Sequence, residues 1–307
     1  MNFTAKDVAA LREKTGCGMM DCKKALTEAN GDAEKAVEIL REKGLAAQTK
    51  KASRIAADGM VYVYIDDAKK IGVIIEVNSE TDFVAKNEEF QALVKGAAKA
   101  AADYKPATVE DLLKCKFEDT ADTVEDVLRE KILKIGENMK IRRFEILEGD
   151  LVSYTHGGGS SACIAQFETE NSASADFQDL GKNICMQVVA MTPDYLAPEE
   201  VPAEVVEKEK NILIAQIKND PASANKPDAV IEKMVSGKIN KFYKENCLLK
   251  QAYVKDDKIS VEQYIAQSAK EFGFAIKLVK FVSYEKGEGL EKRQDDFAAE
   301  VASMTNN

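Results

Sequence analysis

Residues 71–86 have the sequence IGVIIEVNSETDFVAK, in which an apolar run gives way to a polar cluster and an acidic residue precedes a phenylalanine. The β-branched and apolar residues of Ile71–Val77 predict a buried strand. The polar residues Asn78–Thr81 end this strand, and the helical spacing over 88–104 predicts a helix. We therefore expect a strand-to-helix corner here, and the rest of the chain is arranged around it.

Two side chains at the corner, Asp82 and Phe83, are open to more than one interpretation. A carboxylate in the first turn of a helix is favoured by the helix dipole, and phenylalanine is commonly buried. The pattern alone thus favours Asp82 as a first-turn carboxylate and Phe83 as a core residue.

The composition is that of an ordinary soluble protein. The chain has 307 residues, 45% apolar and 31% charged, which suffices for two domains or for one domain with appendages. No apolar run reaches the length of a membrane span, and the N-terminus has no signal-peptide pattern, so we expect a cytoplasmic protein without a membrane partner. The net charge of -10 gives no support for direct nucleic-acid binding.

The sequence also argues against covalent catalysis. His156 is the only histidine, and no GxSxG, HExxH or P-loop pattern accompanies it. The six cysteines are scattered, and Cys17 and Cys22 have no second Cys/His pair nearby. We expect reduced core cysteines, no catalytic residues, no metal and no cofactor. General acid-base work by carboxylates stays open, but no recognisable pattern pairs them.

Residues 1–54 predict three short helices. Thr4 and Asp32 are suitable N-caps for the first and third, and Asn30-Gly31 ends the second. The third helix is expected to end before Lys43-Gly44, and Ala46–Asp58 is expected to be a linker because it lacks an apolar stripe.

Two similar series of elements follow. Each contains a β-hairpin, helical segments and a closing strand, which predicts a weakly duplicated α+β unit. The first series covers 61–65, 71–77, 88–104, 109–113, 124–135 and 142–147, and the second covers 151–154, 162–167, a helix containing Phe177, and 274–284. We place the first subdomain at 55–148 and the second at 149–290.

The second series carries an insertion at about 200–246. Apolar stripes over 202–218 and 227–244 are separated by a segment containing Pro221 and Pro227, which predicts an antiparallel helical hairpin. The sequence leaves open whether the hairpin forms a homodimer or whether its two apolar stripes only pack against each other. Residues 291–307 predict a C-terminal helix that docks internally or on a partner.

Two stretches together indicate a family. Residues 11–26, LREKTGCGMMDCKKAL, and 76–86, EVNSETDFVAK, resemble the two signatures of bacterial elongation factor Ts, and their order and separation also fit. The resemblance covers essentially the whole chain. It implies that residues 1–54 form a module like the ubiquitin-associated three-helix fold, followed by paired α+β subdomains.

The resemblance implies a function as well. This family consists of guanine-nucleotide exchange factors, not enzymes, that bind GDP-bound and nucleotide-free elongation factor Tu and promote GDP release. By resemblance, Phe83 inserts into an apolar pocket of the GTPase domain, and Asp82 disturbs the network around the Mg²⁺ and phosphate site.

Further partner contacts follow only from the resemblance. They are Thr81, Val84, Arg12, Met19, Met20, Lys23, Ile135, Gly136 and His156. From the residues alone, the methionines are equally core residues, Gly136 is a helix C-cap, and the glycine-rich segment after His156 is a tight hairpin turn.

A rival function is a ribosome- or chaperone-associated binding module without exchange activity. It accounts for the helical module and the hairpin, but it leaves the sequence Thr81-Asp82-Phe83 unexplained.

Overall fold

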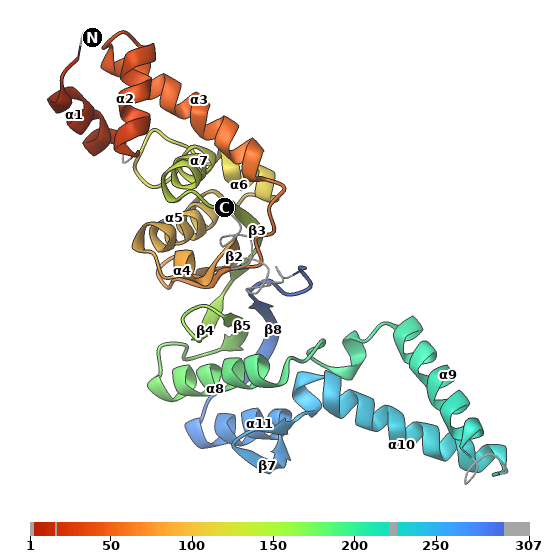
Figure 1. The fold of residues 1–307 in the computed structure, drawn as a ribbon. Coiled ribbons are helices and arrows are strands. Elements are labelled where there is room, and N and C mark those ends of the chain that lie inside the picture. Colours follow the sequence, from red (N-terminus) through yellow and green to blue (C-terminus); the bar gives the residue numbers. More distant parts are fainter. Residues whose placement is uncertain (1–2, 16, 221–225, 292–307) are drawn as a thin grey trace. The chain divides into compact units, whose positions relative to one another are not determined.

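The computed structural model describes residues 3–15, 17–220 and 226–291, and it is a mixture of helices and sheets of the α+β class (Figure 1). The chain divides into two compact units. Of the described residues, the first unit contains 3–15, 17–146, 155–162 and 284–291. The second unit contains 147–154, 163–220 and 226–283.

The first unit begins with three helices, α1 (Ala5–Thr15), α2 (Met19–Glu28) and α3 (Ala33–Lys51). The predicted caps are confirmed, because the Thr4 hydroxyl accepts from Asp7 N and Asp32 Oδ1 accepts from Glu34 N at 2.9 Å. Their apolar faces form a small core that includes Val8, Leu11, Cys22, Leu26, Ala36 and Leu40.

The predicted end of the third helix is wrong. Helix α3 continues through Gly44 to Lys51 and packs on α7 (Val124–Ile135), so most of the first half of the expected linker is helical. Glycine inside a helix costs only about 1 kcal/mol relative to alanine, and the alanine-rich residues that follow favour the helix. Packing against α7 stabilises this part of α3, although its sequence has no apolar stripe.

A three-stranded sheet with the order β1-β2-β3 forms the centre of the first unit. Strands β1 (Asp58–Asp66) and β2 (Ile71–Ser79) pair antiparallel, with Tyr62 opposite Ile75, and β3 (Met139–Glu148) lies on the other side of β2. Every residue of β2 is buried, as its apolar sequence predicts for a central strand.

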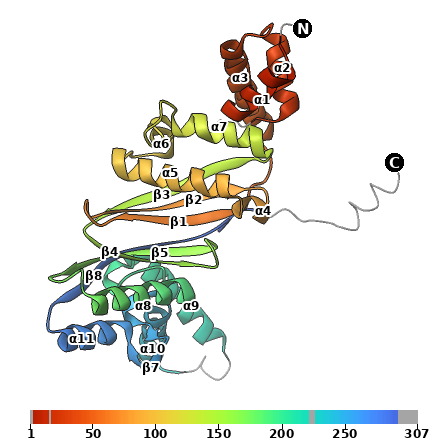
Figure 2. The ribbon, with the colours of Figure 1, turned by 90° about the vertical axis from the view of Figure 1, so that its left-hand side faces the viewer.

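Helices cover one face of this sheet, with α5 (Glu88–Tyr104) lying along it (Figure 2). Helices α4 (Asp82–Ala85) and α6 (Val109–Lys114) flank α5, and α7 also packs against it. The core between sheet and helices includes Val73, Val77, Phe90, Leu93, Ala97 and Ile132.

A buried carboxylate in β2 joins three segments of the first unit. Glu76 is fully buried and accepts from Arg142 Nη1 at 3.0 Å, from Arg143 Nε at 2.6 Å and from the backbone N of Gly287 at 2.8 Å. Burial raises the pKa of Glu76, but hydrogen bonds from Asn78, Gly287 and the two arginines outweigh it, and the pKa is lowered overall. Glu76 is therefore a charged link between β2, β3 and the segment after β8 (Ile276–Glu285).

The second unit contains another three-stranded sheet, of order β4-β5-β8. Strands β4 (Asp150–His156) and β5 (Ser161–Thr169) precede the long helix α8 (Ala175–Met191). The core packs Phe167, Phe177, Leu180, Ile184 and Val261 together. The unit also contains elements that the sequence pattern did not predict: β6 (Ala252–Tyr253), β7 (Asp256–Ser260), α11 (Val261–Phe272) and the short 3-10 turns Pro198–Glu200 and Leu248–Lys250.

The two apolar stripes of the insertion are helical, as predicted. They form α9 (Ala203–Asn219) and α10 (Asp228–Asn246), which run in opposite directions and pack through Leu213, Ile217, Ile231, Val235 and Ile239 (Figure 1).

The C-terminal helix expected at 291–307 lies outside the described residues, apart from Glu291. Among the helices of the described ranges, none combines the length and apolar character that crossing a membrane requires.

Candidate functional site

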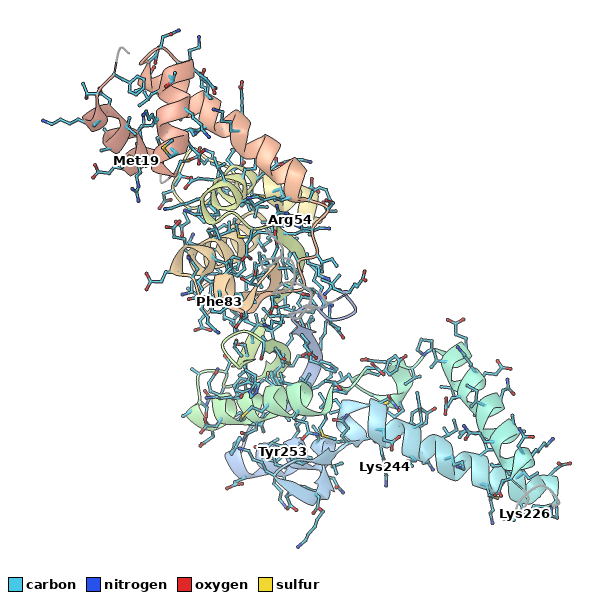
Figure 3. All side chains as sticks on the ribbon, viewed as in Figure 1. Met19, Arg54, Phe83, Lys226, Lys244 and Tyr253 are labelled. Carbon is cyan, nitrogen blue, oxygen red and sulfur yellow. The ribbon has the colours of Figure 1, made fainter. Side chains whose placement is uncertain are left out.

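The strand-to-helix corner exposes its phenylalanine. Strand β2 ends at Ser79, α4 begins at Asp82, and 79% of Phe83 is accessible to solvent (Figure 3). The interpretation of Phe83 as a core residue is therefore wrong. The residue that enters the core is its neighbour Val84, which is 7% exposed, because consecutive side chains of a helix point in different directions.

A carboxylate from outside the corner holds its backbone. Glu137 Oε2 accepts from the backbone N of Glu80 at 3.1 Å and of Thr81 at 3.0 Å, and Oε1 accepts from the Thr81 hydroxyl at 2.7 Å. In return, Glu80 Oε1 accepts from the backbone N of Asn138 at 2.5 Å. The corner and residues 137–138 are thus bonded to each other in both directions.

Asp82 begins α4 as the pattern predicts, and it has a charged partner. Lys86 Nζ donates to Asp82 Oδ2 at 2.8 Å and lies 5.7 Å from the centroid of the Phe83 ring. The hydrogen bond from Lys86 lowers the pKa of Asp82, so the carboxylate is ionised at neutral pH.

Ile135 and Gly136 lie at the end of α7, directly before the carboxylate that bonds the corner. Gly136 adopts φ +90° as the C-cap of α7, so its interpretation as a helix cap is confirmed. Because Glu137 follows Gly136, the structure brings this segment next to Thr81.

His156 ends β4 and begins the glycine-rich turn, where the backbone N atoms of Gly159 and Ser160 donate to its carbonyl oxygen at 3.0 and 3.1 Å. The prediction of a tight hairpin turn is confirmed. Gly159 O accepts from Val61 N of β1 at 2.8 Å, and α4 also packs on β1. The exposed His156 and the Phe83 corner therefore share β1 as a support.

The remaining expected contact residues lie on α1 and α2. Arg12 and Lys23 are exposed, and Met19 and Met20 are 44% and 62% exposed. The interpretation of the two methionines as core residues is wrong, since Cys22, Ala25 and Leu26 supply the buried face of α2.

Known proteins that are similar to this chain belong to one family. The family model described as Elongation factor TS matches residues 80–288, more than half of the chain, and the match includes the Phe83 corner, Gly136 and His156. An elongation factor Ts of Clostridium perfringens (strain SM101 / Type A) is 49% identical over 305 residues, which is 98% of this chain and 99% of the relative. The chain belongs to the elongation factor Ts family.

Other elongation factor Ts proteins are similarly close. One from Clostridium botulinum (strain Alaska E43 / Type E3) is 48% identical over 305 residues, with the same coverage of both chains. Membership of the elongation factor Ts family supports a role as a nucleotide-exchange factor in translation elongation, not as a catalyst of a chemical reaction.

The elongation factor Ts resemblance did not single out Glu137, Glu80 or Lys86 as contributors to the corner. Glu137 is 56 residues from Thr81 in the sequence, so only the fold shows that they meet. Lys86 carried a local signal, because its spacing of four from Asp82 places both on one helical face.

In the part of the chain that the structure describes, no group of three or more His, Cys, Asp or Glu side chains is arranged to hold a metal ion.

Proposed function

We propose that this chain is a guanine-nucleotide exchange factor that binds elongation factor Tu, in its GDP-bound and nucleotide-free forms, in the cytoplasm. GDP and the factor then weaken each other's binding to the partner by the same ratio, because binding linkage is reciprocal. Release of GDP lets GTP bind.

The observation that carries this proposal is the exposed ring of Phe83 on a corner whose backbone is bonded to Glu137. An exposed phenylalanine costs the free protein little, and it becomes an anchor once a partner buries it. We assign Phe83 to an apolar pocket of the GTPase domain.

Asp82 has a separate, electrostatic role in the proposal. Its carboxylate is ionised and, like Phe83, belongs to α4. A negative charge brought near the Mg²⁺ and phosphate site of the partner changes the network that holds GDP, since the ion carries much of the local charge there. Thr81 and Val84 complete the corner, with Val84 acting from the core side.

We assign a supporting surface to Arg12, Met19, Met20, Lys23, Ile135, Gly136 and His156. Exposed methionines suit an apolar contact, because the side chain is flexible and polarisable. No direct contact with nucleic acid is included in the proposal.

The test is release of a fluorescent GDP analogue from purified elongation factor Tu. We expect Phe83→Ala to fold normally and to lower the stimulated release rate by about thirtyfold, which corresponds to a truncation cost of about 2 kcal/mol at an interface anchor. Tyr104→Ala is the control, because Tyr104 is also an exposed aromatic residue of the first unit, at 52%.

In the same assay, Asp82→Asn should reduce stimulation most at Mg²⁺ concentrations that saturate the partner's site, and least when Mg²⁺ is depleted, if its charge acts on the ion. An unchanged release rate for Phe83→Ala would remove the assignment of the ring. Absence of any stimulation by the wild-type chain would instead favour the alternative of a binding module without exchange activity.

Two architectural assignments belong to this proposal. We assign residues 1–54 to a module like the ubiquitin-associated fold, and the two sheet-and-helix units to duplicated subdomains at 55–148 and 149–290, with the hairpin at about 200–246 inserted in the second. The same side-chain bond in both units supports duplication: Gln91 Nε2 donates to Ala85 O at 3.2 Å and Gln178 Nε2 donates to Ser172 O at 2.9 Å, each six residues back. A failure of the two subdomains to superpose would contradict the duplication. Light scattering of the isolated protein decides whether the hairpin forms a homodimer.

A further inference from the structure

Helix α4 cannot hold its own conformation. It contains four residues, and the side chain of its N-cap, Thr81, makes no capping bond to the helix. Helices this short are unstable alone, because nucleation fixes several residues for few hydrogen bonds. The position of Phe83 must therefore be set by contacts that α4 makes with other segments.

On its C-terminal side, α4 is held by the core and by α5. Val84 packs into the core, and Asn87 Oδ1 accepts from Glu89 N at 2.8 Å to cap α5. These contacts fix the residues after Phe83. They do not hold the backbone before Asp82, which needs a separate support.

On the N-terminal side, that support is Glu137. Its carboxylate accepts both backbone N–H groups of Glu80 and Thr81 and also the Thr81 hydroxyl. Hydrogen bonds to an ionised acceptor are stronger than those between neutral groups. The hydroxyl that would otherwise cap α4 is committed to this carboxylate.

Further contacts bond the corner to residues 137–138 in the opposite direction. Glu80 accepts from Asn138 N, and Arg54 Nη1 lies 3.4 Å from Glu80 Oε1. Asn138 Nδ2 donates to Arg54 O at 2.8 Å. The side chain of Glu80 is only 11% exposed, so solvent competes little for these bonds.

We propose that Glu137 is a positioning residue for nucleotide exchange, which holds Phe83 and Asp82 in the orientation that enters the partner. Glu137 also follows Ile135 and Gly136, so it joins two contact segments into one rigid surface. This inference rests on the proposed function.

Glu137→Gln is the decisive variant, since it keeps the size of the side chain but removes its charge, so that the backbone N–H groups of Glu80 and Thr81 donate to a single neutral oxygen in place of a carboxylate. We expect the maximal rate of GDP release at saturating factor to fall about tenfold, as for loss of a hydrogen bond to a charged group. The concentration of factor at half-saturation should change much less, because the contacts of α1 and α2 remain.

Amide hydrogen exchange reports on the orientation directly. In Glu137→Gln, the amides of Glu80 and Thr81 should exchange faster, while amides in the centre of β2 keep wild-type protection. The matched control is Glu110→Gln, an exposed glutamate of α6 in the same unit, which should change neither exchange nor GDP release.

A double-mutant cycle separates this inference from the proposed function. In a Phe83→Ala background, Glu137→Gln should cause little further loss, because the ring it orients is gone. Equal losses in both backgrounds would overturn the positioning role, as would full activity of Glu137→Gln beside an impaired Phe83→Ala. Full activity of Phe83→Ala would overturn the proposed role of the ring and the positioning role together.

Glu80→Gln provides a second test in case Glu137→Gln has a folding defect. It weakens the return bond to Asn138 N and leaves Glu137 in place, so we expect a smaller loss of maximal rate with the same pattern of amide exchange. A loss explained entirely by a lower melting temperature in both variants would overturn the inference.

Discussion

Two strand-to-helix corners, one in each unit, have similar strands and long helices on either side but differ in the segment that joins them. Eight residues separate β2 from α5 and include α4 with the exposed Phe83, whereas five residues separate β5 from α8 without any helical turn. Both long helices have 17 residues and bury a phenylalanine near their start, Phe90 in α5 and Phe177 in α8. Both end at a non-glycine residue with positive φ, +49° at Lys105 and +41° at Thr192.

The second corner shows that a sheet-and-helix unit of this kind folds without α4. The fold therefore does not require the short helix or its exposed ring. The hydrogen bonds from Glu137 that support them are an additional feature of the first unit. A surface that acts on a partner would produce this difference, and four experiments test it.

The largest effect is expected at the buried carboxylate of the first sheet. Glu76→Ala leaves Arg142 and Arg143 without their buried partner, and removing one member of a buried ion pair costs about 3–5 kcal/mol. Gln166 directly precedes the last apolar residue of β5, as Glu76 does in β2. It donates to Glu148 O at 2.8 Å and is partly exposed, so Gln166→Ala should cost about 1 kcal/mol. Urea unfolding followed by amide exchange in each unit measures both, and equal costs would contradict the asymmetry.

The second-largest effect is expected at low pH, which should destabilise the first unit. Hydrogen bonds from Lys134 and from Lys69 lower the pKa of Glu89 and of Asp103, and the pKa of Glu76 is lowered despite burial. Carboxyls with a depressed folded pKa contribute stability above their unfolded pKa values of about 4, and this is lost as pH falls through the folded values.

Unfolding of the first unit should thus become easier below about pH 4. Amide exchange across a pH series measures this loss, and Glu76→Gln should show a weaker dependence on pH. An unchanged pH dependence in that variant would show that Glu76 does not contribute.

Glycines inside the two long helices should respond alike. A Cβ at Gly96 of α5 would overlap the ring of Phe117, and one at Gly181 of α8 would overlap the side chain of Val152. We expect each Gly→Ala variant to lose about 1–3 kcal/mol, since overpacking exceeds the gain in helix propensity. Thermal melting measures the loss, and stabilisation by either substitution would show that its neighbour yields without cost.

The smallest effect separates the starts of the two helices. Asn87 caps α5 through Glu89 N, but Ser174 makes no side-chain cap for α8. Asn87→Ala should cost about 1 kcal/mol, and Ser174→Ala should change stability by only a few tenths. Comparable losses in chemical denaturation would mean that the two starts are equivalent in solution.

Local patterns predicted much of this fold. The apolar spacing of Val124–Ile135 gave α7 with its observed ends, and the glycine at 136 gave its cap. The hairpin of β1 and β2 followed from two β-branched and apolar runs on either side of a charged segment, although β2 extends two residues beyond Val77. These elements are determined by neighbouring residues, so the sequence alone carries them.

The features that were missed depend on distant partners. Helix α4 is too short for a periodic signal, and the bonds from Glu137 that support it cross 56 residues. The end of α3 depends on α7, and exposure of Phe83 contradicts the usual burial of phenylalanine. For Phe83 only the resemblance to a family implied an exposed ring.

The link between Glu76 and Gly287 also bears on how the protein is made. These residues are 211 positions apart, so at a synthesis rate of about 5–20 residues per second the carboxylate emerges roughly ten to forty seconds before its last donor. Until then the first sheet has a buried charge that is one hydrogen bond short. The unit that begins the chain is therefore among the last parts to be completed, and a ribosome stalled near the end of the message would carry a nearly full-length chain with its oldest sheet unfinished.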